Sequence, residues 1–199
     1  GCSWKLFDID ESGFEEAEKV CKDADFIVAC VGEHMLNSGE AHSRTDIRIP
    51  EIQRKFIACL HKLNKPLALV VFGGRPLALS DVEKLADAIL YVWQPGTEGG
   101  NAIANLIYGK ANPCGKTVMS FPRSVGQCPI YYNHFSTARP KRKDIPSFYS
   151  DERFRSGYDD EYNSPLYPFG YGLSYTKFAY SDLKLSAKKL NRGGKITAN

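Results

Sequence analysis

Three runs of the chain are apolar from end to end, and the segments between them carry apolar side chains at helical spacing. Strands that are apolar throughout are typical of a parallel sheet covered on both faces. The predicted strands are residues 26–31, 67–72 and 88–92. The predicted helices are residues 14–21, 50–63, 81–86 and 101–108. This alternation predicts an α/β fold class, a parallel-sheet α/β sandwich with helices on both faces, over residues 1–130.

The pattern changes after a short extended run at residues 117–121. Residues 131–177 follow neither a helical nor a strand period and are rich in proline, glycine, charge and aromatic side chains. We interpret them as an irregular linking segment, longer than an ordinary connection, whose aromatic side chains pack on the domain. Leu183 and Leu185 then alternate with polar residues ahead of a turn at 192–194, so residues 178–199 are predicted to begin a β-domain.

Polar loops follow each of the three predicted strands. The first, residues 32–48, carries two glutamates, two histidines, arginines and aspartate. The carboxyl ends of parallel strands share one edge of a sheet, where α/β folds place ligand chemistry. The side chains that we expect to gather around one cleft at this edge are Glu33, Glu40, Arg75, Trp93 and Glu98.

Composition and charge exclude several classes of protein. The 199 residues are 43% hydrophobic and 25% charged, which is ordinary for one globular domain, or one domain and part of another. The net charge of the chain is +3, and residues 139–155 alone carry a surplus of the same size. They hold six basic residues, Arg153 among them, and three acidic ones. This segment is interpreted as a solvated loop, and nucleic-acid binding is not expected. No apolar run approaches the ~20 residues that span a membrane.

Other catalytic and binding chemistries find little support. The six cysteines, Cys2 included, form no C-x-x-C pair, so most are expected to be free thiols. His34 and His42 lie near the loop glutamates without a metal-binding spacing, and no metal or cofactor is expected. Residues 96–100 are rich in glycine and precede a helix, but match no phosphate-binding fingerprint, which leaves a nucleotide-binding domain as a weak third hypothesis.

The loop glutamates remain as candidates for chemistry. A carboxyl group can donate a proton to a glycosidic oxygen or activate water as a base. Glu40, beside Gly39, has the position at a cleft edge that such a residue needs. The alternative is that Glu33 and Glu40 are both solvated loop charges that pair with Arg44.

Several longer motifs occur together in an order that identifies a family. They are Val31-Gly32-Glu33, Ser38-Gly39-Glu40-Ala41, Ser43-Arg44-Thr45-Asp46, Phe72-Gly73-Gly74-Arg75-Pro76-Leu77, Pro95-Gly96-Thr97-Glu98-Gly99-Gly100-Asn101, Met119-Ser120-Phe121-Pro122-Arg123 and Leu166-Tyr167-Pro168-Phe169-Gly170-Tyr171-Gly172. Across nearly all of residues 19–185 the chain resembles the C-terminal part of glycoside hydrolase family 3 enzymes, especially bacterial periplasmic β-glucosidases. The resemblance implies a periplasmic or secreted protein. Residues 178–199 are then interpreted as the truncated start of a fibronectin type III-like domain.

The resemblance also implies a retaining hydrolase that releases terminal β-linked glucose, or a related sugar, from the non-reducing end. Its nucleophilic aspartate lies in an N-terminal (β/α)8-type domain of the same polypeptide, which these residues lack. The acid/base glutamate corresponds to Glu40, with Glu33 as the alternative. Arg44 is expected to hold the loop or tune Glu40, and Trp93 to line an aromatic cleft that binds the β-glucoside. A non-catalytic carbohydrate-binding or scaffolding domain is the second hypothesis.

Overall fold

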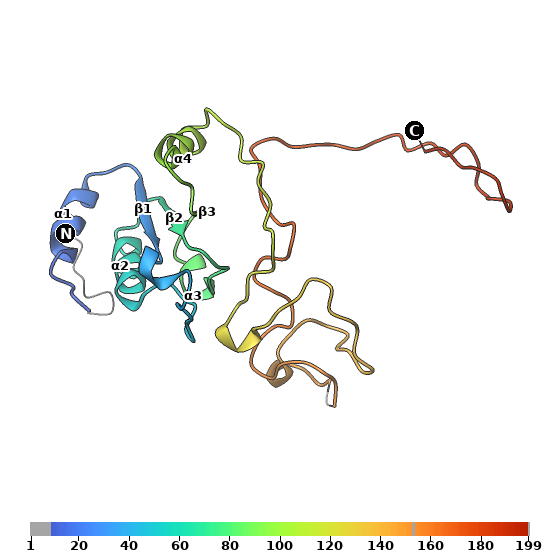
Figure 1. The fold of residues 1–199 in the computed structure, drawn as a ribbon, viewed down its shortest axis with the longest axis horizontal. Helices are drawn as coiled ribbons and strands as arrows, with labels where there is room; N and C mark the ends of the chain where they lie inside the picture. The colour runs from blue at the N-terminus through green and yellow to red at the C-terminus, as the bar shows by residue number, and fades with distance from the viewer. Residues whose placement is uncertain (1–8, 153, 199) are drawn as a thin grey trace.

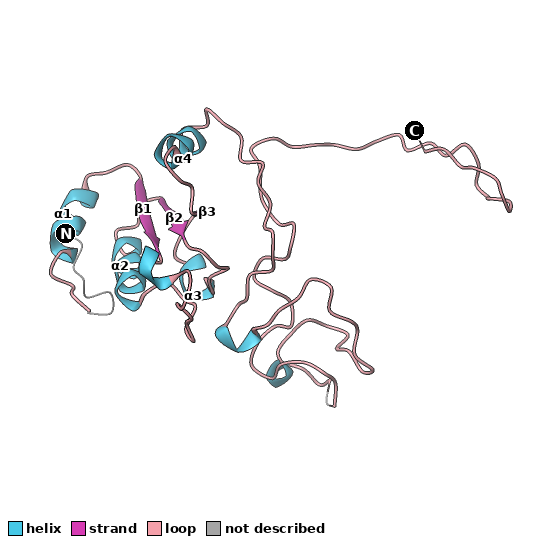
Figure 2. Ribbon diagram, in the orientation of Figure 1, coloured by secondary structure: helices cyan, strands magenta, loops and turns pink. Residues whose placement is uncertain are grey.

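A three-stranded parallel sheet forms the centre of the N-terminal part of the chain, where the helices α1 to α4 surround it (Figures 1 and 2). The computed structural model describes residues 9–152 and 154–198. The strands are β1 (Ile27–Gly32), β2 (Leu67–Phe72) and β3 (Ala88–Trp93), in the order β1-β2-β3. Ile27 is in register with Leu67, and Ala68 with Ala88. The predicted α/β class with a parallel sheet is confirmed, and all three strands lie within one residue of the expected positions.

Three helices form a layer on one face of the sheet. They are α1 (Phe14–Lys22), α2 (Glu51–His61) and α3 (Ser80–Glu83), and α2 packs on β1 and contacts both α1 and α3. Alternate residues of β1 point into this layer, which with β2 and α2 makes the apolar core. Its fully buried members include Ile57, Leu60, Leu67, Leu69, Val71, Leu77, Leu79, Val82 and Phe121.

The helices begin and end within three residues of the predicted limits, and the differences at the start of α2 and the end of α3 can be described locally. Pro50 precedes α2 as its N-cap instead of lying in its first turn. The helix predicted at residues 81–86 ends at Glu83, and the chain continues in turns to Ala86. The reason is that Asp87 must already pair with β2: its amide donates to the carbonyl of Leu67, and its carboxylate accepts from the amide of Leu67 at 2.8 Å.

The fourth helix, α4 (Gly99–Ile107), lies over the opposite face of the sheet. Its residues Ile103, Ala104 and Ile107 line an open apolar groove together with Val28 and Cys30, the outward-facing residues of β1. Helices therefore cover both faces, but this face is covered incompletely, since Val28 keeps 40% of its surface exposed. No helix in the described ranges is long and apolar enough to cross a membrane.

The segment after α4 folds back on the domain through one strip of aromatic residues. The run expected to be extended at residues 117–121 forms only a bridge between Phe121 and Tyr167, as far as the chain is described. Phe121 is buried in the core, and Tyr167 stacks on Tyr171 with ring centroids 5.1 Å apart. Many other aromatic side chains between residues 131 and 180 are exposed, Phe135 at 92% among them. The domain limits at residues 130 and 177 stay predictions.

Residues 178–198 extend from the rest of the molecule as an exposed arm (Figure 1). Leu185 and Ala198 form an antiparallel bridge, and the amide of Gly194 donates to Asn191 in the turn between them. The predicted turn is therefore present, whereas Leu183 and Leu185 are both exposed and form no buried strand face. A fibronectin type III-like domain stays a prediction. Two short 3-10 helices lie between α4 and the arm: Val125–Gln127 precedes the irregular segment, and Ser147–Tyr149 lies within it.

The end of β1 depends on a glycine. Gly32 has φ +136°, and a Cβ there would lie 1.9 Å from the carbonyl oxygen of Phe72 on the neighbouring strand. We expect Gly32→Ala to lower the free energy of unfolding by about 2–3 kcal/mol, because it adds backbone strain and displaces β2. Thermal denaturation checks this. Gly109→Ala is the control, since Gly109 has φ +67° with open space around it and isolates the strain. An equal loss in both variants would show that the contact with Phe72 is unimportant.

Candidate active site

Glu33 is the first residue after β1, and its side chain points inward. The amide of Glu33 donates to the carbonyl of Phe72 at 2.9 Å, which continues the sheet for one more residue. The side chain of Gln53, in the first turns of α2, holds the preceding residue by both backbone groups: it accepts from the amide of Gly32 at 2.7 Å and donates to its carbonyl at 3.0 Å. With its backbone fixed in this way, Glu33 leaves only 1% of its side chain exposed.

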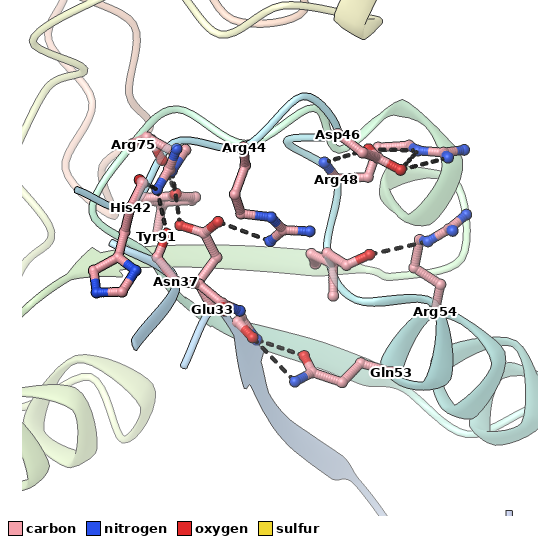
Figure 3. A network of polar contacts seen from close by, with 12 residues as sticks. Glu33, Asn37, His42, Arg44, Asp46, Arg48, Gln53, Arg54, Arg75 and Tyr91 are labelled. Atoms are coloured by element: carbon pink, nitrogen blue, oxygen red, sulfur yellow. Dashed lines mark hydrogen bonds and ion pairs between the residues drawn. The ribbon is translucent and has the colours of Figure 1, made fainter. Parts of the chain in front are cut away.

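Two arginines occupy the two oxygens of the Glu33 carboxylate (Figure 3). Arg44 Nη1 lies 2.9 Å from Oε1, and Arg75 Nε lies 3.1 Å from Oε2. The arginine side chains are themselves mostly buried, with 17% and 21% exposed. Charged hydrogen bonds of this kind compensate the removal of a carboxylate from water. Glu33 is therefore an internal anion that joins two loops.

Arg75 extends this network to the loop that follows Glu33. Its Nη2 donates to the carbonyl of Asn37 and makes a longer contact, 3.5 Å, with the carbonyl of His42. The backbone of Arg75 is fixed in turn by Tyr91 on β3, whose hydroxyl donates to the Arg75 carbonyl. Burial raises the pKa of the Tyr91 hydroxyl, so this group stays a hydrogen-bond donor throughout the physiological pH range.

Glu40 lies at the tip of a tight turn between the two carbonyls that Arg75 contacts. The amide of His42 donates to the carbonyl of Gly39 at 3.2 Å and closes the turn. Gly39 and Ala41, the neighbours of Glu40, both have positive φ, +119° and +62°. A positive φ is uncommon for alanine, and non-glycine residues in this region often occur near functional sites. Glu40 itself is exposed.

A second carboxylate–arginine pair fixes the far end of the loop. Asp46 accepts from Arg48 Nε at 3.0 Å and from Arg48 Nη2 at 2.7 Å, and these hydrogen bonds lower the pKa of Asp46 to about 2. Ile47 then accepts from the amide of Ala78 at 3.0 Å. The loop between Glu33 and Arg48 is thus held by hydrogen bonds at both ends.

The sequence-predicted cleft residues divide into two groups. Glu33 and Arg75 meet as expected, and Arg44 joins Glu33. Trp93 ends β3 with φ +53°, and its ring packs edge-on against Tyr91 at a centroid distance of 4.9 Å. Glu98 lies apart from the arginines and accepts from Asn101 at the start of α4, at 2.7 Å.

Four residues that hold this part of the chain carried no predicted role. They are Gln53, Tyr91, Asp46 and Arg48. Tyr91 lies within an apolar strand run and Gln53 on a helix, where neither pattern marks a polar role. The spacing of Asp46 and Arg48 two residues apart in a loop is the one local signal that was available.

No metal centre is seen in the parts of the chain that the structure describes, where no three His, Cys, Asp or Glu side chains form a suitable group. His34 Nδ1 accepts from the amide of Leu36 at 3.2 Å, and His42 contributes its carbonyl to Arg75. The described cysteines, Cys21, Cys30, Cys59, Cys114 and Cys128, are all free, and Cys2 and Arg153 lie outside the described residues.

The chemistry available to the two glutamates therefore differs. The Glu33 carboxylate is enclosed, and each of its two oxygens is bound to an arginine. Glu40 presents its carboxyl group to the outside from a turn whose ends are held. A carboxyl group in this position can exchange a proton with a bound molecule.

Known proteins with this pattern are glycoside hydrolases. The glycosyl hydrolase family 3 C-terminal domain matches residues 8–175. The chain is 52% identical over 185 residues to the periplasmic beta-glucosidase of Salmonella typhimurium, covering 93% of this chain and 24% of that protein. It is 35% identical to a beta-xylosidase of Formosa agariphila, over 100% of this chain and 26% of that protein.

Solved structures agree with these relatives. The beta-glucosidase from Listeria innocua, in complex with gluconolactone, superimposes with a TM-score of 0.81 at 40% identity, over 92% of this chain and 24% of that chain. The chain thus spans about a quarter of the length of the proteins it matches. The match over residues 8–175 and the identity to these relatives show that the chain belongs to glycosyl hydrolase family 3, as its C-terminal domain.

Proposed function

We propose that this chain is part of a retaining, exo-acting β-glucosidase that hydrolyses terminal non-reducing β-D-glucosyl residues, and that Glu40 is its general acid/base. The observation that carries the proposal is the contrast between the two loop glutamates. Glu33, with 1% of its side chain exposed, is bound to Arg44 and Arg75, whereas Glu40 is exposed on a turn whose flanking carbonyls, of Asn37 and His42, contact Arg75. The 52% identity to a periplasmic beta-glucosidase supports the choice of substrate and a periplasmic or secreted location.

The proposed reaction has two steps. In the first, a nucleophilic aspartate attacks the anomeric carbon, the glycosidic C–O bond breaks, and Glu40 gives its proton to the departing oxygen. In the second, the Glu40 carboxylate takes a proton from water, whose oxygen attacks the anomeric carbon and releases the aspartate. Glu33 and Arg44 support the loop, and Trp93 is proposed to line the sugar-binding cleft.

The nucleophile is proposed to lie in a (β/α)8-type domain of the same polypeptide, outside these residues. The exposed surface supports a large covering partner. The chain exposes 14837 Å², whereas a compact monomer of 22.2 kDa exposes about 9,400 Å². The exposed side chains include large aromatic ones, namely Phe135, Phe148, Tyr149, Phe154, Phe178 and Tyr180.

The first prediction from this proposal concerns the isolated chain. Retaining chemistry needs two carboxylates about 5–5.5 Å apart, and only one is proposed to lie here. We therefore expect residues 1–199, purified and shown to be folded by circular dichroism, to release no nitrophenol from an aryl β-glucoside. The full-length enzyme assayed alongside is the positive control. Sustained turnover by the isolated chain would contradict the proposal.

The substrate class is tested in the full-length enzyme. We expect hydrolysis of an aryl β-D-glucoside to exceed that of the matching β-D-xyloside, with β-glucose as the first product in a proton NMR time course. The comparison is informative because relatives of this chain include both beta-glucosidases and beta-xylosidases. A preference for the xyloside would replace glucose by xylose as the proposed sugar of the substrate. Release of α-glucose as the first product would exclude a retaining mechanism.

A further inference from the structure

We propose that Arg75 is the positioning residue for the turn that carries Glu40, and that it fixes this turn by binding the backbone on both sides of it. The inference rests on the proposed function of Glu40 and assigns a role to a different residue, on the loop after β2. Arg75 is not proposed to contact the substrate. It acts through the main chain of the Glu40 turn.

The contacts of Arg75 enclose the turn. One guanidinium nitrogen, Nη2, contacts the carbonyl of Asn37, three residues before Glu40, and that of His42, two residues after it. Between these points the chain is closed by the hydrogen bond from His42 to Gly39. Because both ends of the turn share one nitrogen atom, a shift of Arg75 would move the whole turn.

A packing contact next to Arg75 holds the same turn independently. Gly74 lies so close to Ser38 that a Cβ at Gly74 would be 2.2 Å from Ser38 Oγ and 3.1 Å from Ser38 Cβ. Ser38 precedes Gly39 at the start of the turn. Gly74 thus touches the turn by van der Waals contact, and Arg75 touches it by hydrogen bonds.

Arg75 can serve this purpose because it is fixed from two other strands. Its Nε donates to Glu33 at the end of β1, and its carbonyl accepts from the hydroxyl of Tyr91 on β3 (Figure 3). The guanidinium is planar and presents its donors in a fixed geometry, so one side chain can bind a carboxylate and two carbonyls at once. A lysine has a single nitrogen and cannot maintain all of these contacts.

The expected consequence is specific to proton transfer. A turn released from Arg75 leaves the Glu40 carboxyl group poorly placed relative to the glycosidic oxygen. Hydrolysis of substrates whose leaving group needs a proton, such as cellobiose, should then become slower. An aryl glucoside with a strongly acidic leaving group, such as dinitrophenol, departs without this help and should be affected little. A residue that merely stabilised the fold would change both substrates alike.

The test is made in the full-length enzyme that contains this chain, by measuring kcat/KM for cellobiose and for dinitrophenyl β-glucoside. We expect Arg75→Ala to lower the value for cellobiose about 10- to 100-fold and that for the aryl glucoside less than about 3-fold. Arg75→Lys should fall close to Arg75→Ala. Arg54→Ala is the matched control, because Arg54 is also an ion-paired arginine, 22% exposed against 21% for Arg75, but binds Asp81 and the Ile49 carbonyl. Arg54→Ala should not change the ratio of the two kcat/KM values.

A double-mutant cycle with Glu40→Ala decides whether Arg75 acts through Glu40. We expect Arg75→Ala to have no further effect on cellobiose once Glu40 is absent. Independent, multiplying effects, or equal losses on both substrates, would overturn the role of Arg75 while leaving Glu40 in place. If Glu40→Ala alone leaves cellobiose hydrolysis intact, the proposed function itself fails. If Arg75→Ala does not fold, Tyr91→Phe replaces it in the same cycle. We expect Tyr91→Phe to change the ratio of kcat/KM for cellobiose to that for the aryl glucoside by about 3- to 10-fold. An unchanged ratio would overturn the proposal.

Discussion

Glu40→Ala in the full-length enzyme is expected to lower kcat/KM for cellobiose by about 10²- to 10⁴-fold, the range that general acid catalysis contributes. The same variant should retain most of its kcat/KM on dinitrophenyl β-glucoside, because that leaving group needs no proton. The physical basis is the exposed position of Glu40 on a turn closed between Gly39 and His42. The variant also lacks the base for the second step, so turnover of the activated substrate should be limited by hydrolysis of the glycosyl-enzyme.

Azide supplies the confirming measurement. A small anion can enter the space left by the carboxylate and attack the glycosyl-enzyme without a base, which should raise kcat on the activated substrate and yield β-glucosyl azide. Glu15→Ala is a suitable control, since Glu15 is an exposed glutamate on α1 whose side chain is 79% exposed. It should behave as wild type on both substrates and show no response to azide.

The other results of this experiment discriminate between the remaining hypotheses. Near wild-type rates on both substrates would identify Glu40 as a solvated loop charge. The chain would then fit a carbohydrate-binding or scaffolding domain whose parent enzyme has its acid/base elsewhere. An equal loss on both substrates, without azide rescue, would point to a structural effect of the substitution on the loop.

The sheet could be predicted from the sequence because its strands leave no ambiguity. Residues 67–72 are apolar throughout, lie between a proline and two glycines, and form β2 with the predicted limits. The logic of parallel strands also brought Glu33 and Arg75 to one edge, where they form an ion pair although they are 42 residues apart. Both results follow because apolar runs specify the strands, and parallel strands place their carboxyl ends at the same edge of the sheet.

Individual partners could not be predicted, because they depend on distances of a few tenths of a nanometre between side chains. Arg44 had two expected acidic partners in its own loop, Glu33 and Glu40, and only the structure shows that it binds Glu33. The hydroxyl of Tyr91 was hidden within an apolar run. The exposed aromatic residues after residue 131 present a different difficulty, since apolar side chains predict burial without showing which part of a larger protein covers them.

Glu33→Ala is expected to destabilise the domain by about 3–5 kcal/mol, the cost of removing one partner from a buried ion pair. Arg44 and Arg75 would be left facing each other, 17% and 21% exposed, with no anion between them. Differential scanning calorimetry of the full-length enzyme would show this as a lower transition temperature for this domain. Glu33→Gln should be nearly as unstable, because it keeps the shape and loses the charge.

Asp46→Ala is the matched control for this prediction. Asp46 also binds an arginine of the same loop, at 2.7 Å, but its pair with Arg48 is 43–45% exposed. Exposed pairs contribute about 0–1 kcal/mol, so the loss should be several times smaller than for Glu33→Ala. Equal losses in the two variants would show that burial is not the source of the stability.

The substrate profile of Glu33→Ala carries the final distinction between the two glutamates. If Glu33 supports the loop, the variant should lose thermal stability, and any loss of activity should follow through Arg75 and the Glu40 turn. If instead Glu33→Ala stays as stable as wild type, loses cellobiose hydrolysis and responds to azide on the activated substrate, then Glu33 is the acid/base. Its enclosure by Arg44 and Arg75 would then have to open when substrate binds, and the assignment of Glu40 would be wrong.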